Sequence, residues 1–161
     1  MKLKLLIMFV IVSCALIVPL FSQNTNDASD KMSSLQLADK LSESSEVKFN
    51  EVVEFMMLAV NGNYRNFRDG LDFLVRNDIA QGIKLSEYDN VNLGTLSLMC
   101  ARTLKLKNSL FYNIFGSKRY AVRACADIGL IPGTSGEYDK VSGEELIEIM
   151  RKLASYEGIR R

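Results

Sequence analysis

The chain of 161 residues has no histidine and no tryptophan, and it has only two prolines and three cysteines. Without histidine it lacks the commonest general base and the commonest metal ligand. Without tryptophan it also lacks the strongest cation–π platform. No nucleophile motif compensates for these absences. We therefore expect a protein that is not an enzyme and that holds no metal or other cofactor.

An excess of charge of one sign is also missing. The whole chain has 20 basic and 19 acidic residues, a net charge of +1. Without residues 1–22, which contain Lys2 and Lys4, 18 basic and 19 acidic residues remain, a net charge of −1. A general nucleic-acid binder should carry a clear basic excess, so no nucleic-acid partner is expected. At 161 residues the chain is long enough for one domain and too short for two.

The first 22 residues have the layout of a secretory signal peptide. Two lysines precede an almost unbroken apolar run from Leu5 to Val18, which Pro19 ends, and a polar segment follows. This run of about 14 residues is shorter than the ~20 that span a bilayer as a helix. We predict cleavage near Ser22.

Two other outcomes for this segment stay open. Cys14 ends the sequence Ile-Val-Ser-Cys, a loose match to the site at which lipoproteins are lipidated. The apolar run could also stay in place as an uncleaved anchor. In all three cases the mature chain lies outside the cytoplasm, in the periplasm or cell envelope. It would contact a membrane only if it were lipidated at Cys14 or kept its signal.

After the signal, residues 23–46 read as a flexible polar linker in which Leu35, Leu37 and Leu41 could support one amphipathic turn. Helical periodicity then recurs through residues 47–156. It predicts helices over 47–60, 66–76, about 92–104 and 118–128, a short apolar turn at 110–115, and a last helix after Ser142. The tail, 157–161, is expected to fray.

An internal repeat organises this helical part. Residues 88–104 (YDNVNLGTLSLMCARTL) return as residues 138–153 (YDKVSGEELIEIMRKL), with Leu96 matching Leu146. The helix at 47–60 shares the same apolar positions. We predict an all-α fold of tandem helix–loop–helix repeats, with one half-unit at 47–60 and two units at 66–104 and 118–153. All of them should share a single core, because one such unit cannot bury its apolar face alone.

One stretch of the chain resembles the S-layer homology repeat. It consists of a helix, the sequence Gly-Leu-Ile-Pro-Gly, a polar loop, and Tyr-Asp-Lys-Val-Ser-Gly-Glu-Glu-Leu, which opens a second helix. The similarity is clearest over residues 118–153 and weaker over 66–104. At the family's Thr-Arg-Ala-Glu-type motif, Ser142 and Glu145 match, whereas Gly143 stands where the family has Arg. The resemblance implies an extracytoplasmic module that binds cell-envelope glycans.

Cys100 and Cys125 are the only cysteines after the signal. In an exported protein such a pair suggests a disulfide. Both also lie on apolar helix faces, where a free cysteine behaves as a small hydrophobic residue. Both alternatives stay open.

The segment between Asn90 and Ala126 contains no acidic residue. Its cations are interleaved with aromatic side chains, and together they predict a ligand-binding patch for an anionic partner. The patch consists of Arg102, Lys105, Lys107, Lys118, Arg119, Tyr120 and Arg123. The alternative is that these cations form an ordinary solvated basic face and that the aromatic side chains belong to the core.

The expected function is that of an exported binding or anchoring protein, with envelope polysaccharide or another envelope protein as partner. A periplasmic protein–protein adaptor is the alternative.

Overall fold

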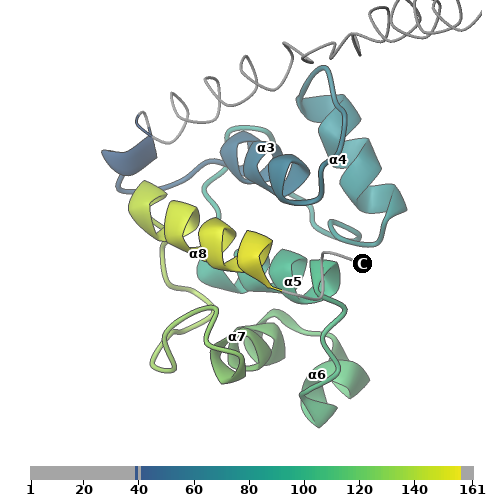
Figure 1. The fold of residues 1–161 in the computed structure, drawn as a ribbon, viewed down its shortest axis with the longest axis vertical. Helices are drawn as coiled ribbons and strands as arrows, with labels where there is room; N and C mark the ends of the chain where they lie inside the picture. The colour runs from purple at the N-terminus through teal and green to yellow at the C-terminus, as the bar shows by residue number, and fades with distance from the viewer. Residues whose placement is uncertain (1–38, 40, 157–161) are drawn as a thin grey trace, which may run out of the picture. The chain divides into compact units, whose positions relative to one another are not determined.

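The residues described in the computed structural model, 39 and 41–156, form six helices and no strand, so the predicted all-α class is confirmed for them. The predicted signal peptide, most of the linker and the tail lie outside these residues. None of the described helices is both long and apolar enough to cross a bilayer. The helices are α3 (Phe49–Ala59), α4 (Phe67–Arg76), α5 (Leu93–Thr103), α6 (Leu110–Phe115), α7 (Lys118–Asp127) and α8 (Gly143–Ser155) (Figure 1).

Polar caps set the start of the main helices. The side chains of Asn66, Asn92 and Ser142 each accept a hydrogen bond from a backbone N–H in the first turn that follows, as N-caps do. The cap of α3 is neither of the two serines that precede it, Ser44 and Ser45, although serine is a common N-cap residue. It is Lys48, whose backbone N–H donates to the Glu51 carboxylate at 2.8 Å. The carboxylate three residues into the helix thus replaces the serine as the capping group.

The first turns of α3, α5 and α8 are linked in a closed cycle of backbone hydrogen bonds. Phe49 N–H donates to the carbonyl of Asp89, just before α5, at 2.9 Å, and Leu93 N–H donates to that of Asp139, just before α8, at 2.8 Å. Gly143 N–H donates to Ser44, just before α3, at 2.9 Å. Each of these helices therefore begins against the segment that leads into another, and N–H groups that a helix leaves unpaired find partners.

The turns that precede α5 and α8 are built alike. In both, the Asp side chain accepts a hydrogen bond from a backbone N–H three residues earlier: Asp89 from Ser86 and Asp139 from Gly136, each at 2.7 Å. These turns present the carbonyls that the first turns of α3 and α5 use. Tyr88 and Tyr138, the residues between, project from these turns and are 71% and 82% exposed.

One hydrophobic core joins the described helices. Val47, Val91 and Val141, each two residues before the start of a helix, are buried in it. Leu96 and Leu146, which the sequence paired, are both fully buried. Leu41 is also in the core at 1% exposure, so residues 41–46 are not the flexible linker that their polar composition suggested. The apolar side chain and the Gly143–Ser44 hydrogen bond fix this segment.

The pairing of helices differs from the predicted units. The sequence paired α4 with α5 and α7 with α8, whereas α4 packs chiefly on α3 and α7 chiefly on α5. Elements that follow each other in the chain and are joined by a short connection usually lie side by side, as α3 and α4 do. Gly70 also lets α4 approach α3, because a Cβ there would lie 3.1 Å from a Val53 methyl.

Two glycines allow backbone to approach the helix starts closely. A Cβ on Gly94 would lie 2.7 Å from the Glu137 carbonyl oxygen. A Cβ on Gly143 would lie 1.7 Å from the Leu41 carbonyl oxygen, far inside contact distance. A helix also comes close at Gly94, because its Cβ would lie 3.1 Å from the Cβ of Lys118, the first residue of α7.

Candidate functional site

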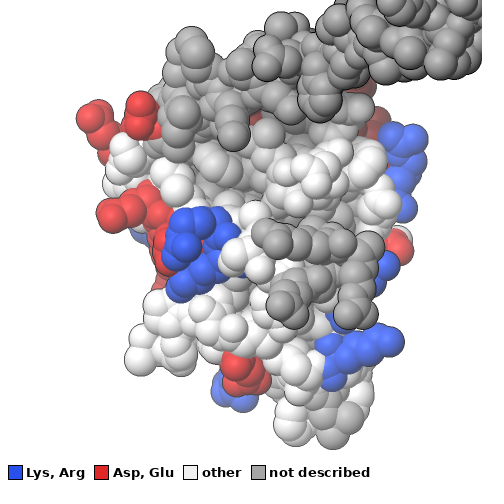
Figure 2. All heavy atoms as spheres, viewed as in Figure 1, with Lys and Arg blue, Asp and Glu red and all other residues white. Residues whose placement is uncertain are grey.

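The predicted patch lies along the end of α5, the loop that follows it, and α7. Lys105, Lys107, Arg119 and Arg123 are exposed, whereas the other three residues are half-buried. In Figure 2 a group of Lys and Arg side chains lies beside a largely uncharged part of the surface over α6. We use the name α6–α7 surface for these four exposed cations together with Phe111, Ile114, Phe115 and Tyr120.

Arg102 has a structural role within the predicted patch. Its guanidinium donates to the backbone carbonyls of Ile79 and Gln81, at 3.2 and 2.7 Å. These bonds hold the turn after α4 against α5. Hydrogen bonds from a charged group are among the stronger ones in proteins, so we expect Arg102 to stabilise the fold.

The predicted apolar turn is the short helix α6. Ser109 caps it by accepting from Tyr112 N–H at 3.3 Å, and Gly116 ends it with a φ of 55°, a conformation that suits glycine. The buried Tyr112 points into the core. Asn108 in the preceding loop donates to the Ala124 carbonyl of α7 at 3.2 Å. Tyr112 and the Asn108 hydrogen bond thus hold α6 against the rest of the domain.

The other side of α6 carries large exposed apolar side chains. Phe111, Ile114 and Phe115 are 54%, 63% and 61% exposed. Tyr120 of α7 stacks on both phenylalanines, with ring centroids 5.6 Å from Phe111 and 5.5 Å from Phe115. Offset or stacked aromatic pairs of this kind add stability beyond their buried area. The result is an ordered aromatic cluster that still faces solvent.

A shallow hollow of about 330 Å³ adjoins this cluster. Aromatic, cationic, carboxylate and hydroxyl side chains line it together. They include Ser109, Phe111, Tyr120, Arg123, Asp127 and Ser135. An aromatic face beside several hydrogen-bonding groups suits a small polar ligand such as a sugar. Asp127 offsets part of the positive charge at this edge.

Both cysteines of the helical part are free and buried. The Cys125 thiol donates to the Ser97 carbonyl at 3.4 Å. Burial raises the pKa of the Cys125 thiol to about 12 and that of Cys100 well above its ordinary range. The disulfide, one of the two alternatives left open by the sequence, is not formed. Thiols with raised pKa values are poor nucleophiles and poor metal ligands.

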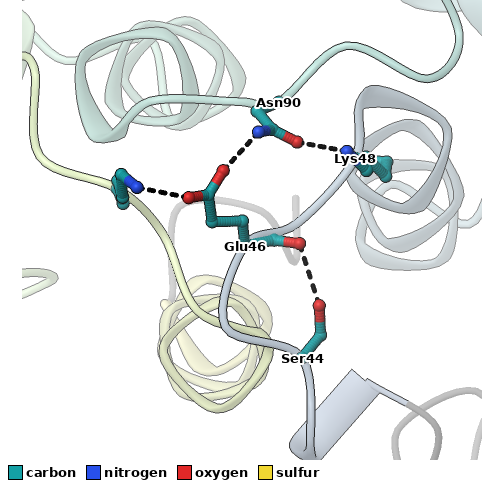
Figure 3. Close-up of polar contacts among 5 residues, drawn as sticks. Ser44, Glu46, Lys48 and Asn90 are labelled. Atoms are coloured by element: carbon teal, nitrogen blue, oxygen red, sulfur yellow. Dashed lines mark hydrogen bonds and ion pairs between the residues drawn. The ribbon is translucent and has the colours of Figure 1, made fainter.

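A separate cluster of polar side chains lies where the three segments before α3, α5 and α8 meet. The Glu46 carboxylate forms an ion pair with Lys140 and accepts from the Asn90 amide, and Lys48 donates to Asn90 (Figure 3). The hydrogen bond from Lys140 lowers the pKa of Glu46. Glu46, Asn90 and Lys140 each directly precede one of the buried valines. The hydrogen-bonding groups of these side chains pair with one another, so we assign the cluster a structural role in holding the three segments together.

No group of histidine, cysteine or carboxylate side chains in the described part of the chain could hold a metal ion. The feature that sequence reasoning missed is the exposure of α6. Phe111, Ile114 and Phe115 follow the i, i+3, i+4 spacing of one helix face. That spacing shows that they share a side, but it cannot show whether that side faces the core.

No known family model, characterised protein or solved structure matches the chain.

Proposed function

We propose that this protein is an exported, non-enzymatic binding module of the cell envelope that attaches to an anionic component through its α6–α7 surface. The signal-like residues 1–22 support the location outside the cytoplasm. Because the net charge of the whole chain is close to zero, binding to an anionic component would have to depend on a local group of cations.

We further propose that α3, α5 and α8 are three equivalent elements of a repeat similar to the S-layer homology repeat. Support comes from the valine that stands two residues before each helix and from the cyclic hydrogen bonds among their first turns. It also comes from the matching turns closed by Asp89 and Asp139. The units would start at these valines, so that α4 follows α3 and α7 follows α5 as outer helices.

The observation that carries the binding proposal is the pairing of exposed cations with exposed aromatic rings. No acidic residue lies between Asn90 and Ala126 in the chain, so Lys105, Lys107 and Arg119 have no acidic sequence neighbour, whereas Asp127 lines the hollow together with Arg123. A surface of one sign attracts ligands of the opposite sign and raises their association rate. Beside it, the Phe111–Tyr120 stack offers flat apolar faces.

A non-catalytic role is supported by the side chains that are available. The chain has no histidine to act as a base. The two thiols of the helical part are buried with raised pKa values and lack an activating partner.

The test is binding of the full chain to purified envelope polysaccharide from a candidate host, with Arg119→Ala and Arg123→Ala combined. Two exposed cations contribute roughly 0.5–1 kcal/mol each at low salt, so we expect a loss of roughly five- to thirtyfold in affinity. Arg65→Ala combined with Arg68→Ala is the matched control, because both residues are exposed and lie at α4. Equal affinities for the two double variants would refute the assignment of this surface.

A further inference from the structure

Large exposed apolar side chains are scattered over most of the described surface, but three of them gather on α6. Leu58, Val75 and Tyr156 are exposed by 37–40%, and Tyr88 and Tyr138, in the turns before α5 and α8, by 71% and 82%. No helix carries more than one of them. Phe111, Ile114 and Phe115 are exposed by more than half on a helix of six residues. Soluble proteins rarely keep such a group uncovered unless it meets a partner.

Exposed cations lie on the segments that flank this apolar face. Lys105 and Lys107 precede α6, and Arg119 and Arg123 lie on α7, to which Tyr120 ties the phenylalanines by stacking. All four are exposed. An apolar centre flanked by cations is complementary to the acyl–headgroup boundary of an anionic bilayer, where apolar side chains enter the hydrocarbon edge and cations contact the phosphates.

We propose that α6 docks on the surface of a membrane that contains anionic phospholipid. Phe111, Ile114 and Phe115 enter the interface, and Lys107, Arg119 and Arg123 contact the headgroups. The proposal rests on the proposed function, since it names the anionic envelope component as lipid. α6 lies in the interface and does not span the bilayer.

The way α6 is held supports docking as a rigid element. Tyr112 in the core, the Asn108–Ala124 hydrogen bond and the Ser109 cap fix the helix from its inner side. The outer side chains are therefore positioned before any contact forms, and little ordering is required on binding. The long stems of the lysines can lie along the apolar face while their ammonium groups reach phosphate.

A single patch of three apolar residues gives weak, reversible binding, because stable attachment generally takes two membrane signals. If the apolar run at residues 5–18 remains as an anchor, or if Cys14 carries a lipid, α6 supplies the second signal and orients the helical domain on the leaflet. If the run is removed, docking depends on α6 alone and is transient.

The absence of tryptophan allows a direct test, because a single introduced tryptophan is then the only indole in the chain. Phe115→Trp reports from α6, and Tyr138→Trp, at an exposed turn before α8, is the matched control. Each full-length variant is mixed with vesicles of brominated phosphatidylcholine, either alone or with an equal part of phosphatidylglycerol. Bromine quenches an indole only when the ring enters the bilayer. This readout distinguishes docking of α6 from anchoring by the N-terminal segment.

We expect quenching of Phe115→Trp on the vesicles that contain phosphatidylglycerol, with little quenching of Tyr138→Trp. Adding Lys107→Gln, Arg119→Gln and Arg123→Gln to Phe115→Trp should weaken binding by at least tenfold and remove most of its salt dependence. Adding Phe111→Ser and Ile114→Ser should also cost at least tenfold. Free inorganic phosphate at matched ionic strength should not compete, because the surface and not the isolated anion is recognised.

Absence of quenching at position 115 on anionic vesicles would overturn the proposal. If polysaccharide binding still depended on Arg119 and Arg123 in that case, the proposed function would stand and the lipid assignment alone would fail. If neither vesicles nor polysaccharide bound, both would fail. Equal quenching at positions 115 and 138 would also overturn the proposal, because it would show that contact is not specific to α6.

Discussion

Replacing Gly143 with alanine should destabilise the protein, although a helix usually gains stability from this change. Glycine in a helix interior is less favourable than alanine by up to ~1 kcal/mol, and Gly143, as the first residue of α8, should gain less than this from the change. Sequence reasoning alone would therefore predict that Gly143→Ala stabilises α8. In the structure a Cβ at this position would lie 1.7 Å from the Leu41 carbonyl oxygen and 2.5 Å from the carbonyl carbon. Both are backbone atoms, so no side-chain rotation relieves the contact.

The loss in the free energy of unfolding can be estimated from the contacts that break when residues 41–44 move away from a Cβ at position 143. Displacing residues 41–44 breaks the 2.9 Å hydrogen bond from Gly143 N–H to Ser44, a loss of about 1 kcal/mol. It also draws Leu41, now 1% exposed, out of the core, and full exposure of a leucine costs about 1.5–3 kcal/mol. After the helix propensity gain is subtracted, we expect a net loss of about 2 kcal/mol.

The measurement is urea unfolding followed by circular dichroism, with the free energy of unfolding obtained by linear extrapolation. Gly133→Ala is the matched control, because a Cβ there meets no atom within 4 Å, and we expect a change within about 0.5 kcal/mol. A Gly143→Ala protein as stable as the wild type, or more stable, would refute the close approach of residues 41–44 to α8.

Two further predictions concern other buried groups. Because the pKa of the Cys125 thiol is about 12 in the folded protein and 9.0 when unfolded, its protonated form stabilises the fold fully below pH 9, and this contribution falls by about 1.4 kcal/mol per pH unit as the pH rises towards 12. The free energy of unfolding of the wild type should therefore fall more steeply above pH 9 than that of Cys125→Ala, and parallel curves would contradict the assignment. Arg102→Ala should cost about 2 kcal/mol in the free energy of unfolding through its two bonds to backbone carbonyls, whereas Lys105→Ala should cost less than about 0.5 kcal/mol; hydrogen exchange at residues 79–82 would show whether that turn loosens.

The helices were predictable because local rules decide them. Asn66, Asn92 and Ser142 are strong N-caps, and each lies where an apolar period begins. The inward positions of α8, such as Leu146 and Ile149, follow directly from that period. The cap of α3 cannot be predicted in this way, because the capping role of Lys48 depends on the Glu51 carboxylate and lysine itself is not a capping residue.

Contacts between segments that lie far apart in the chain could not be predicted from such local rules. The repeat at a spacing of fifty residues marks similar helices, but it does not show which helix packs on which. The burial of Leu41 depends on α8, about a hundred positions later in the chain. The exposure of Phe115 likewise depends on Tyr112 occupying the inner side of α6. An apolar period locates a face, and only the tertiary fold shows what lies against it.

The cyclic hydrogen bonds among the starts of α3, α5 and α8 have a consequence for how the protein unfolds. In a linear stack of repeats the end units can open while the middle remains folded, and stability is approximately a sum over neighbours. Here neither end is free, because the start of α8 bonds to the segment before α3. Detaching any one of the three helices leaves unpaired groups on the other two. The domain should therefore lose its structure in one all-or-none transition, with amides from the first and last of these helices exchanging at the same rate.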